Sequence, residues 1–350
     1  MIGATGNVGT SVLAALADEP AAEEVMAIAR RPPHDTAVLG PRVSFHAADI
    51  TCDDLTGLLA GVDAVVHLAW LIQPSRDERV TRAVNVEGSR RVLDAVLAAG
   101  VSTLVYASSV GAYSPGPKDR LVDESWPTDG IPSLFYARHK AEVERLLDRF
   151  ERERPEVRVV RMRPGLIFKR TAATEIRRLF VGPLLPSPLV RQEAIPLVPD
   201  VPRLRFQAVH SHDVGDAYRL ALLAESRGAF NLAAEPVLDG PALAELLGAR
   251  AVALRRGVLR AAVGLSWRAR LQPSPPGWID LALAVPLLDS GRAARELEWT
   301  PKTSAGDALL ELLEGLRDGA DAPTPPLARA TSGPLRGAEL RGGVGAREVV

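Results

Sequence analysis

Three glycines at the start of the chain constrain its fold more than any other feature. They form the run Gly3-x-x-Gly6-x-x-Gly9. Glycines at this spacing let a backbone turn tightly, approach a phosphate group closely and pack a helix against a sheet. Because one glycine triplet is a weak signal, a phosphate-binding turn and an ordinary tight turn both remain open. The apolar residues that follow have helical spacing and predict a helix whose N-terminus faces the turn: Val8, Val12, Leu13 and Leu16.

Apolar runs and helical stretches alternate along the next two hundred residues or so. This alternation predicts a parallel, doubly wound sheet in an α/β fold. A long helical stretch covers residues 79–99. The expected strands are residues 25–29, 43–46, 64–69, 103–109 and 157–161, with 206–210 and 229–232 returning to the sheet region.

The first strand of such a sheet should be central, yet only Met1 and Ile2 precede Gly3. A strand averages about 5–6 residues, so two residues supply only its last part. This shortage predicts that a few coding residues lie upstream of Met1. The alternative is that water or another segment fills the gap and that the chain folds with lower stability.

A tyrosine and a lysine four residues apart, Tyr136 and Lys140, share one face of a predicted helix. An ammonium beside a tyrosine favours the phenolate and can lower its pKa from ~10 by roughly 1–3 units, which makes the pair a candidate for proton transfer. A solvated helix face is the alternative for this common spacing. Ser109 ends a predicted buried strand, at the edge where ligands bind in open α/β sheets.

Taken together, these motifs resemble the extended short-chain dehydrogenase/reductase superfamily, in particular its NAD-dependent epimerase/dehydratase family. The resemblance runs from Gly3 to about Leu316 and rests on eight motifs in the family's order. They are Gly3-x-x-Gly6-x-x-Gly9, Asp49-Ile50, Val66-His67-Leu68-Ala69, Asn85-Val86-x-Gly88, Ser108-Ser109-x-x-x-Tyr113, Tyr136-x-x-x-Lys140, Arg163-Pro164-Gly165 and His210-x-x-Asp213-Val214.

The resemblance implies a Rossmann-type doubly wound parallel sheet with a smaller, discontinuous C-terminal substrate domain. The dinucleotide-binding domain would comprise residues 1–167, with 206–234 returning to it. Residues 168–205 fit no strand clearly and, with 235–318, would form the substrate domain. Residues 319–350 contain mostly Ala, Gly, Pro and Arg, so we expect them to form a disordered tail.

The same resemblance implies the roles of the site residues. Ser109, Tyr136 and Lys140 match the family's catalytic triad, in which the tyrosine exchanges a proton while hydride moves to or from nicotinamide. For Asn85 we favour support of the active-site strand over a catalytic role. The expected cofactor-binding residues are Gly3, Thr5, Gly6, Asn7, Val8, Gly9, Arg30, Arg31, Asp49, Ile50, Leu68, Ala69, Asn85, Tyr136, Lys140 and Pro164.

The cofactor is NAD or NADP, and one feature bears on the choice. NAD enzymes usually place an acidic residue after the second strand, where it binds the ribose hydroxyls. Here that position reads Ala29-Arg30-Arg31. Arginine there favours the 2′-phosphate of NADP, and solvated surface charge is the alternative.

Several other residues look more functional than we expect them to be. His210 and His212 should point to opposite faces of a strand end, so we expect no metal site. His67 should be a core histidine and His139 a solvated one. Cys52 should lie on a surface turn without an activating neighbour, and Tyr113 should pack near the substrate entrance.

Composition fits a soluble cytoplasmic enzyme. The net charge of −1 provides no excess of positive charge for binding nucleic acid or an anionic membrane. The single cysteine excludes an internal disulfide, and no apolar run reaches the ~20 residues that a membrane helix needs. We therefore expect a small-molecule substrate, with no nucleic-acid or membrane partner. A homodimer is compatible with the resemblance.

The predicted function is that of an NAD(P)-dependent oxidoreductase of the epimerase/dehydratase type, and a nucleotide sugar is the leading substrate. The first alternative is an NADPH-dependent carbonyl reductase of a small hydrophobic ketone or aldehyde. An apolar pocket wall that contains Phe180, Leu184, Leu185 and Leu189 would suit that alternative. The second alternative, a non-catalytic NAD(P)-sensing protein, is disfavoured because a sensor needs none of the triad residues.

Overall fold

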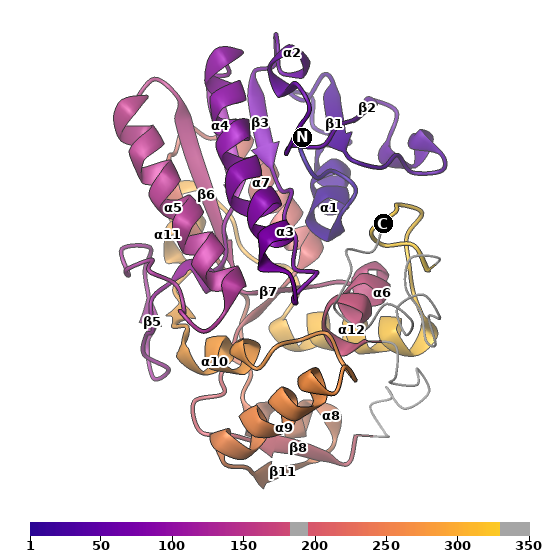
Figure 1. The fold of residues 1–350 in the computed structure, drawn as a ribbon, viewed down its shortest axis with the longest axis vertical. Coiled ribbons are helices and arrows are strands. Elements are labelled where there is room, and N and C mark those ends of the chain that lie inside the picture. Colours follow the sequence, from indigo (N-terminus) through magenta and orange to yellow (C-terminus); the bar gives the residue numbers. More distant parts are fainter. Residues whose placement is uncertain (183–194, 330–350) are drawn as a thin grey trace.

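Parallel strands form the central sheet of the computed structural model, which describes residues 1–182 and 195–329. Their order is β2, β1, the residue Ile2, β3, β4, β6 and β10 (Figure 1). The bounds are β1 Val25–Ala29, β2 Val43–Ala47, β3 Ala64–His67, β4 Thr103–Ala107, β6 Arg158–Pro164 and β10 Gly228–Leu232. The predicted doubly wound α/β sheet is therefore confirmed.

The centre of the sheet is closed by the first residues of the chain. Ile2 forms a parallel bridge to Ile28 on one side and to His67 on the other. The Ile2 N–H donates to the Val66 carbonyl at 2.8 Å, and the Leu68 N–H donates to the Ile2 carbonyl at 2.8 Å. These bonds place the glycine turn directly after the sheet, at its carboxyl edge.

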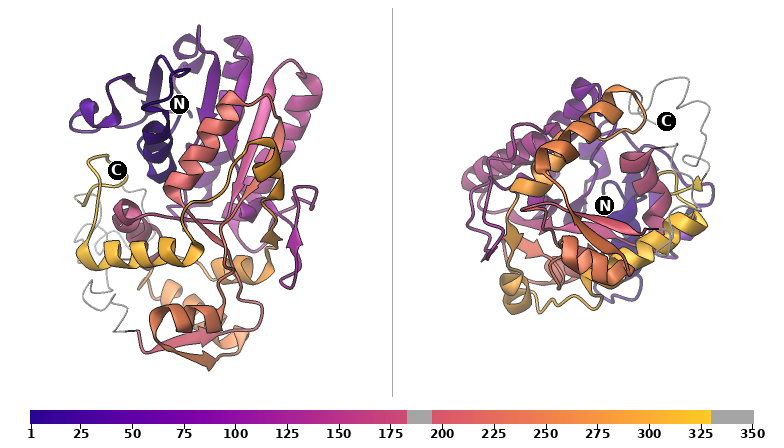
Figure 2. Two further views of the ribbon diagram at one scale, coloured as in Figure 1. Left: turned by 180° about the vertical axis from the view of Figure 1, so that it is seen from behind. Right: turned by 90° about the horizontal axis from the view of Figure 1, so that it is seen from below.

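Helices cover both faces of the sheet. In Figure 1, α3 Glu78–Arg82, α4 Ser89–Ala98 and α5 Phe135–Glu153 lie in front, and the reverse view in Figure 2 shows α1 Asn7–Leu16 and α7 Ser211–Leu223. A π-helical turn, Ala83–Gly88, joins α3 to α4, so the predicted helical stretch 79–99 is continuous. The helix α5 buries Val143 and Leu147 against the sheet, as its apolar spacing predicts.

A second group of elements lies beyond the carboxyl ends of the strands, at the bottom of Figure 1. Here β8 Leu197–Asp200 pairs with β11 Arg250–Ala253. The other short pairs are β5 Leu121–Val122 with β12 Leu287–Leu288, and β7 Leu166–Phe168 with β9 Ala208–His210. The remaining helices of the described residues are α6 Ala173–Ile176, α8 Gly240–Leu247, α9 Arg256–Arg268, α10 Gly277–Ala284, α11 Gly291–Glu296 and α12 Ala305–Asp318, together with α2 Leu55–Leu58, which lies at the top of Figure 1, at the opposite end of the sheet.

Two expectations about strands need correction. Residues 168–205 contain a strand, β8, which alternation did not reveal because it is short and its partner β11 lies about fifty residues later. Of the two segments expected to return to the sheet region, β10 joins the central sheet beside β6. The other, β9, pairs with β7 instead, in a separate two-stranded sheet.

The predicted disordered tail was wrong for residues 319–329. Helix α12 ends at Gly319, whose left-handed backbone (φ +62°) suits glycine, and the chain then turns back toward the glycine turn. The Thr324 hydroxyl donates to the Thr5 carbonyl at 2.8 Å, and Leu327 is fully buried. Composition could not reveal these contacts, because they depend on a turn more than three hundred residues away. The rest of the tail, 330–350, lies outside the described residues.

Candidate active site

A cavity of about 820 Å³ opens at the carboxyl ends of β1, β3, β4 and β6. Side chains of α6 and α10 close it from the opposite side, including Ile176 and Trp278. The residues predicted for cofactor binding and catalysis all line this cavity, with the exception of Asn85. Of the expected apolar wall, Phe180 lines the cavity, and the three leucines, Leu184, Leu185 and Leu189, lie outside the described residues.

The glycine turn has the shape that a dinucleotide diphosphate requires. Gly3 has φ +86°, and a Cβ there would lie 2.7 Å from the Ala69 nitrogen. A Cβ on Gly9 would lie 2.4 Å from the Ala4 carbonyl oxygen. At Gly6 the nearest atom to such a Cβ is 3.8 Å away, so this side of the turn is accessible. The turn and the N-terminus of α1 therefore fit a dinucleotide.

One end of the cavity brings together Arg30 and Arg31 after β1 with Asp49 and Ile50 after β2. The Asp49 carboxylate accepts hydrogen bonds from the backbone and hydroxyl of Thr51 at 2.8 and 2.6 Å, which fixes this turn. Ile50 is buried, and a Cβ on Gly88 would lie 2.7 Å from its Cδ1. The glycine of the Asn85-Val86-x-Gly88 motif thus makes room for Ile50.

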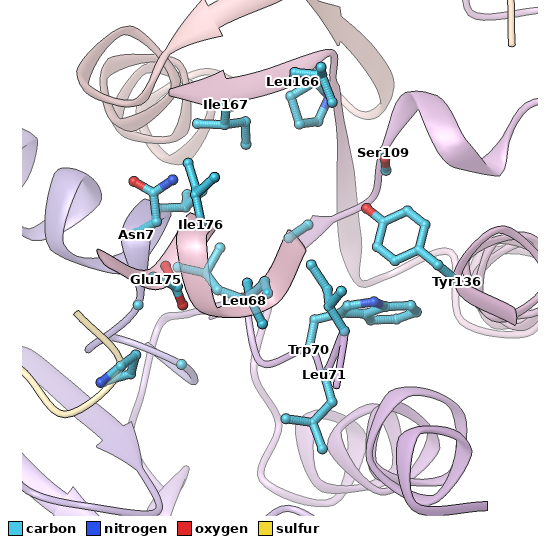
Figure 3. A pocket seen from close by; sticks show the side chains of 18 of the residues that line it. Asn7, Leu68, Trp70, Leu71, Ser109, Tyr136, Leu166, Ile167, Glu175 and Ile176 are labelled. Carbon is cyan, nitrogen blue, oxygen red and sulfur yellow. The ribbon is translucent and has the colours of Figure 1, made fainter. Parts of the chain in front are cut away.

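Helix α5 and the end of β4 assemble the catalytic candidates. Tyr136 lies in the first turn of α5, and Ser109 follows β4, where its Oγ accepts the Gly111 N–H at 3.0 Å. The Ser109 and Tyr136 hydroxyls point toward one another in Figure 3. A Cβ on Gly111 would lie 2.8 Å from the Tyr136 ring, so glycine lets the two residues approach.

The electrostatics of the pair differ from the sequence-based hypothesis. Burial raises the pKa of Tyr136 to about 12, although the Ser109 hydroxyl opposes this change. Burial also lowers the pKa of Lys140 well below its usual value, and the Glu144 charge opposes that change. The Lys140 Nζ donates to the Ala107 carbonyl at 2.6 Å and lies 5.8 Å from the centre of the Tyr136 ring. The expectation that Lys140 brings the tyrosine pKa below its usual value was wrong, because burial dominates.

Aromatic side chains surround Tyr136, and of these only Phe180 was expected in the pocket wall. Its ring centre lies 5.9 Å from that of Trp70 and 5.1 Å from that of Trp278, which in turn is 5.0 Å from Phe180. The Lys140 Nζ lies 3.5 Å from the centre of the Trp70 ring, a cation–π contact. Trp70 directly follows the Val66-His67-Leu68-Ala69 motif, so its position was a usable signal. No sequence signal pointed to Trp278.

A buried ion network holds α5 in place behind the catalytic candidates. The Glu144 carboxylate accepts hydrogen bonds from Arg163 at 2.8 and 2.9 Å, from Arg161 at 2.8 Å and from the Ser108 hydroxyl. Burial alone would raise the pKa of Glu144, but the Arg163 hydrogen bond and the two arginine charges outweigh it and hold the pKa at about 2. Glu144 is four residues after Lys140, and this spacing was the available signal.

Asn85 supports the site from behind. Its side-chain amide exchanges two hydrogen bonds with the Leu71 backbone, at 2.7 and 2.8 Å. Leu71 and Trp70 both line the cavity, so Asn85 fixes the segment after β3. This geometry is consistent with the preferred support role, although the segment held is a loop and not the strand itself.

The other residues of interest have mostly structural positions. His67 is buried as expected and lies 2.9 Å from the Ser89 hydroxyl. His139 was expected in solvent but is 1% exposed, because it packs beside Phe135. Tyr113 is also fully buried, away from the entrance, and donates to Asn231 at 2.7 Å. Cys52 is exposed.

The two C-terminal histidines do not diverge as expected. Their ring centres are 5.0 Å apart, because β9 ends at His210 and α7 begins at Ser211. His210 pairs with Glu311 at 3.1 Å, and the Asp213 carboxylate accepts the Thr303 N–H at 3.0 Å. Within residues 1–182 and 195–329, no cluster of His, Cys, Asp and Glu has the arrangement of a metal site, and no helix could span a membrane.

Comparison with known proteins identifies the family of the chain. A model of the NAD dependent epimerase/dehydratase family matches residues 1–233. Sterol-4-alpha-carboxylate 3-dehydrogenase of Saccharomyces cerevisiae is 31% identical over 129 residues, which are 36% of this chain and 37% of that protein. NAD-dependent glucose-6-phosphate dehydrogenase of Haloferax volcanii is 28% identical over 193 residues, 51% of this chain and 71% of that protein. The first relatives are thus matched over less than two thirds of their length, 37% for the yeast protein and 62% for three uncharacterised mycobacterial proteins.

Solved structures share the fold over almost the whole chain. A UDP-glucose 4-epimerase from Thermotoga maritima has a TM-score of 0.66 at 18% identity, covering 91% of this chain and 98% of that one. A dTDP-glucose 4,6-dehydratase from Streptomyces venezuelae, solved with NAD, has a TM-score of 0.64 at 22% identity, covering 93% and 98%. At these identities the likeness concerns the fold alone.

Proposed function

Because this chain belongs to the NAD-dependent epimerase/dehydratase family, we propose that it is an NAD(P)-dependent oxidoreductase that interconverts a secondary alcohol and a ketone on a bulky apolar substrate. One observation carries the proposal: the Ser109–Tyr136 pair faces a cavity whose substrate side is aromatic. A bound nicotinamide dinucleotide would supply or accept the hydride, and the glycine turn described above fits such a group.

Tyr136 would donate the proton in the direction of reduction. With its pKa raised to about 12 by burial, its hydroxyl holds the proton at neutral pH. A ketone oxygen beside Tyr136 and Ser109 would accept hydrogen bonds from both hydroxyls, and the Tyr136 proton would pass to that oxygen as hydride reaches the carbonyl carbon. The products are an alcohol and a tyrosinate, which regains its proton from solvent.

In its protonated form, Lys140 would stabilise the tyrosinate formed in that step. A charge 5.8 Å from the ring centre is worth roughly 3 kcal/mol at an effective dielectric constant of about 20. The Ala107 carbonyl and the Trp70 ring hold the ammonium in place. Its charge therefore acts on the transition state, where negative charge develops on the phenol oxygen.

The lining of the cavity supports an apolar substrate over a nucleotide sugar. Trp70, Phe180 and Trp278 form a continuous aromatic wall beside Tyr136, and Leu281 and Val285 extend it. Apolar and aromatic walls with few polar groups bind apolar ligands, whereas a sugar needs a matching set of hydrogen-bonding partners. This reverses the order of preference given by the sequence, in which the nucleotide sugar came first.

The arginines after β1 support NADP(H) as the preferred cofactor. Arg30 and Arg31 line the end of the cavity where the adenosine ribose would lie. A guanidinium suits a 2′-phosphate, which it can bind through two hydrogen bonds. The family description names NAD, so the preference for NADP(H) is part of our proposal.

The test compares substrate classes and cofactors directly. We would follow oxidation of NADPH and NADH in the presence of polycyclic or aryl ketones, and measure epimerisation or dehydration of UDP-glucose by product analysis. We expect ketone reduction that Tyr136→Phe abolishes. Turnover of the nucleotide sugar without ketone reduction would contradict the apolar substrate, and tight dinucleotide binding without any turnover would favour the sensor.

A further inference from the structure

The first turn of α1 faces a side chain from another part of the chain. Helix α1 begins at Asn7 after Gly6, and no side chain caps it. The carboxylate of Glu175, which lies in α6 and lines the cavity, faces the Asn7 N–H, and this N–H favours the ionised carboxylate. Figure 3 shows Glu175 and Asn7 at the same end of the pocket. A free N–H at a helix N-terminus is the group that holds a dinucleotide diphosphate in this fold.

Two cations face the same carboxylate. Arg178 lies 3.8 Å from Glu175, and both side chains are largely buried, with exposed fractions of 10% and 16%. Lys169 also attracts Glu175, and its Nζ donates to the Asn7 carbonyl at 2.8 Å and to the Thr10 hydroxyl at 2.7 Å. Glu175 is therefore held by an N–H and two positive charges, which are the partners that a phosphate would use.

A second polar group at this position has no partner within the chain. The Oδ1 of Asn7 is buried and makes no hydrogen bond to any residue in the described part of the structure. Buried amide oxygens are nearly always paired, so this atom marks a position for a ligand donor, which on a dinucleotide would be a ribose hydroxyl beside the diphosphate. Together with Glu175, it indicates that the local arrangement is completed by a bound molecule.

We propose that Glu175 is an internal competitor of the dinucleotide diphosphate, occupying its N–H partner and its cations until the dinucleotide displaces it. This inference rests on the proposed function, since it concerns the same cofactor. Carboxylate and diphosphate cannot share the site, because both are anions that need the same donors. When the dinucleotide binds, the Asn7 N–H, the Arg178 guanidinium and the positive charge of Lys169 therefore interact with the diphosphate instead of with Glu175.

The displacement would reach the substrate side of the cavity. Glu175 lies in α6, and this helix continues into the π-helical turn Arg177–Val181, which carries Leu179 and Phe180. Phe180 packs against Trp278, and Trp278 against Tyr136. Movement of Glu175 away from α1 thus adjusts the wall that the substrate meets, so that cofactor binding prepares the substrate pocket.

The test measures binding and does not depend on turnover. Dissociation constants of NADPH, NADH, ADP and adenosine would be determined by calorimetry for the wild type, Glu175→Gln and Glu175→Ala. Glu314→Gln is the matched control, because Glu314 is exposed on α12 and its replacement removes the same charge. We expect both Glu175 variants to bind NADPH, NADH and ADP about tenfold more tightly, with adenosine and the control unchanged.

Any other result would contradict the inference that Glu175 competes with the dinucleotide diphosphate. Unchanged or weaker binding of the diphosphate ligands in both variants would mean that Glu175 does not compete or that it helps to hold the cofactor. An equal gain for adenosine would show a general change in the pocket. If the wild type binds adenine dinucleotides and the variants gain nothing, this inference fails alone, whereas a wild type that binds no dinucleotide removes the proposed function as well.

Discussion

The buried carboxylate of Glu144 offers a test of how the catalytic helix is held. Its side chain is fully buried, and those of Arg161 and Arg163 are each 6% exposed. Replacement by glutamine keeps the size and part of the hydrogen bonding but removes the charge between the two arginines. Removing one partner of a buried ion network leaves uncompensated charge and costs about 3–5 kcal/mol.

The pKa of Glu144 gives an independent magnitude. It is held at about 2 instead of 4.5, mainly because Arg163 and Arg161 outweigh the effect of burial. Each pKa unit corresponds to about 1.4 kcal/mol, so the ionised carboxylate contributes about 3 kcal/mol to stability. Because the folded-state pKa is depressed, this contribution is complete above pH 4.5 and is lost as the pH falls toward 2. The two arguments therefore agree.

The assay is thermal or denaturant unfolding of the wild type and Glu144→Gln at several pH values. At pH 7 we expect a loss of about 3 kcal/mol, which is of the order of 5–10 °C in the unfolding midpoint. The difference between the two proteins should shrink as the pH falls below the usual glutamate pKa. Asp148→Asn is the control, since Asp148 also contacts Arg161 but is 47% exposed and should cost less than about 1 kcal/mol. Equal stability at pH 7, or a difference that does not change with pH, would refute the reasoning.

Three further predictions concern the site. Tyr136→Phe should lower kcat by about 10²–10⁴-fold with dinucleotide affinity retained, because only the proton-carrying oxygen is removed; full activity with a confirmed substrate would exclude Tyr136 as the acid. Replacing both Arg30 and Arg31 by alanine should weaken NADPH binding more than tenfold in a fluorescence titration and leave NADH nearly unchanged, whereas equal losses would indicate general surface charge. Trp278→Ala should raise KM for an apolar ketone about tenfold or more without changing NADPH affinity, and an unchanged KM would place the substrate elsewhere.

Local patterns were enough to predict the sheet and the positions of the catalytic candidates. Strand Val25–Ala29 was predicted at its observed bounds, because a continuous apolar run between polar turns has few other solutions in an α/β chain. The glycine turn, Ser109 and Tyr136 were located because each lies at a fixed offset from such a strand or helix. The order of elements then brings them to one edge of the sheet.

Features that depend on contacts distant in sequence could not be predicted. The environment of Tyr136 is set by Trp70 and Trp278, which lie 66 residues before it and 142 residues after it. The pKa of Tyr136 is raised because its side chain is buried, and the four-residue spacing to Lys140 does not determine this direction. His139 was placed in solvent by helical periodicity alone, but Phe135 and Glu78 of α3 cover that face. Solvent exclusion is a property of the assembled pocket and leaves no local sequence pattern.

The hydrogen bond between Thr324 and Thr5 has a consequence for biosynthesis. It joins residues that are 319 positions apart in the chain. At a translation rate of about 5–20 residues per second, Thr5 is synthesised roughly 16–64 s before Thr324. During that interval the nascent chain carries an incomplete cofactor loop. Protection of the N-terminal region from proteases by added dinucleotide should therefore be weaker in ribosome-bound chains that stop short of Thr324 than in those that include it.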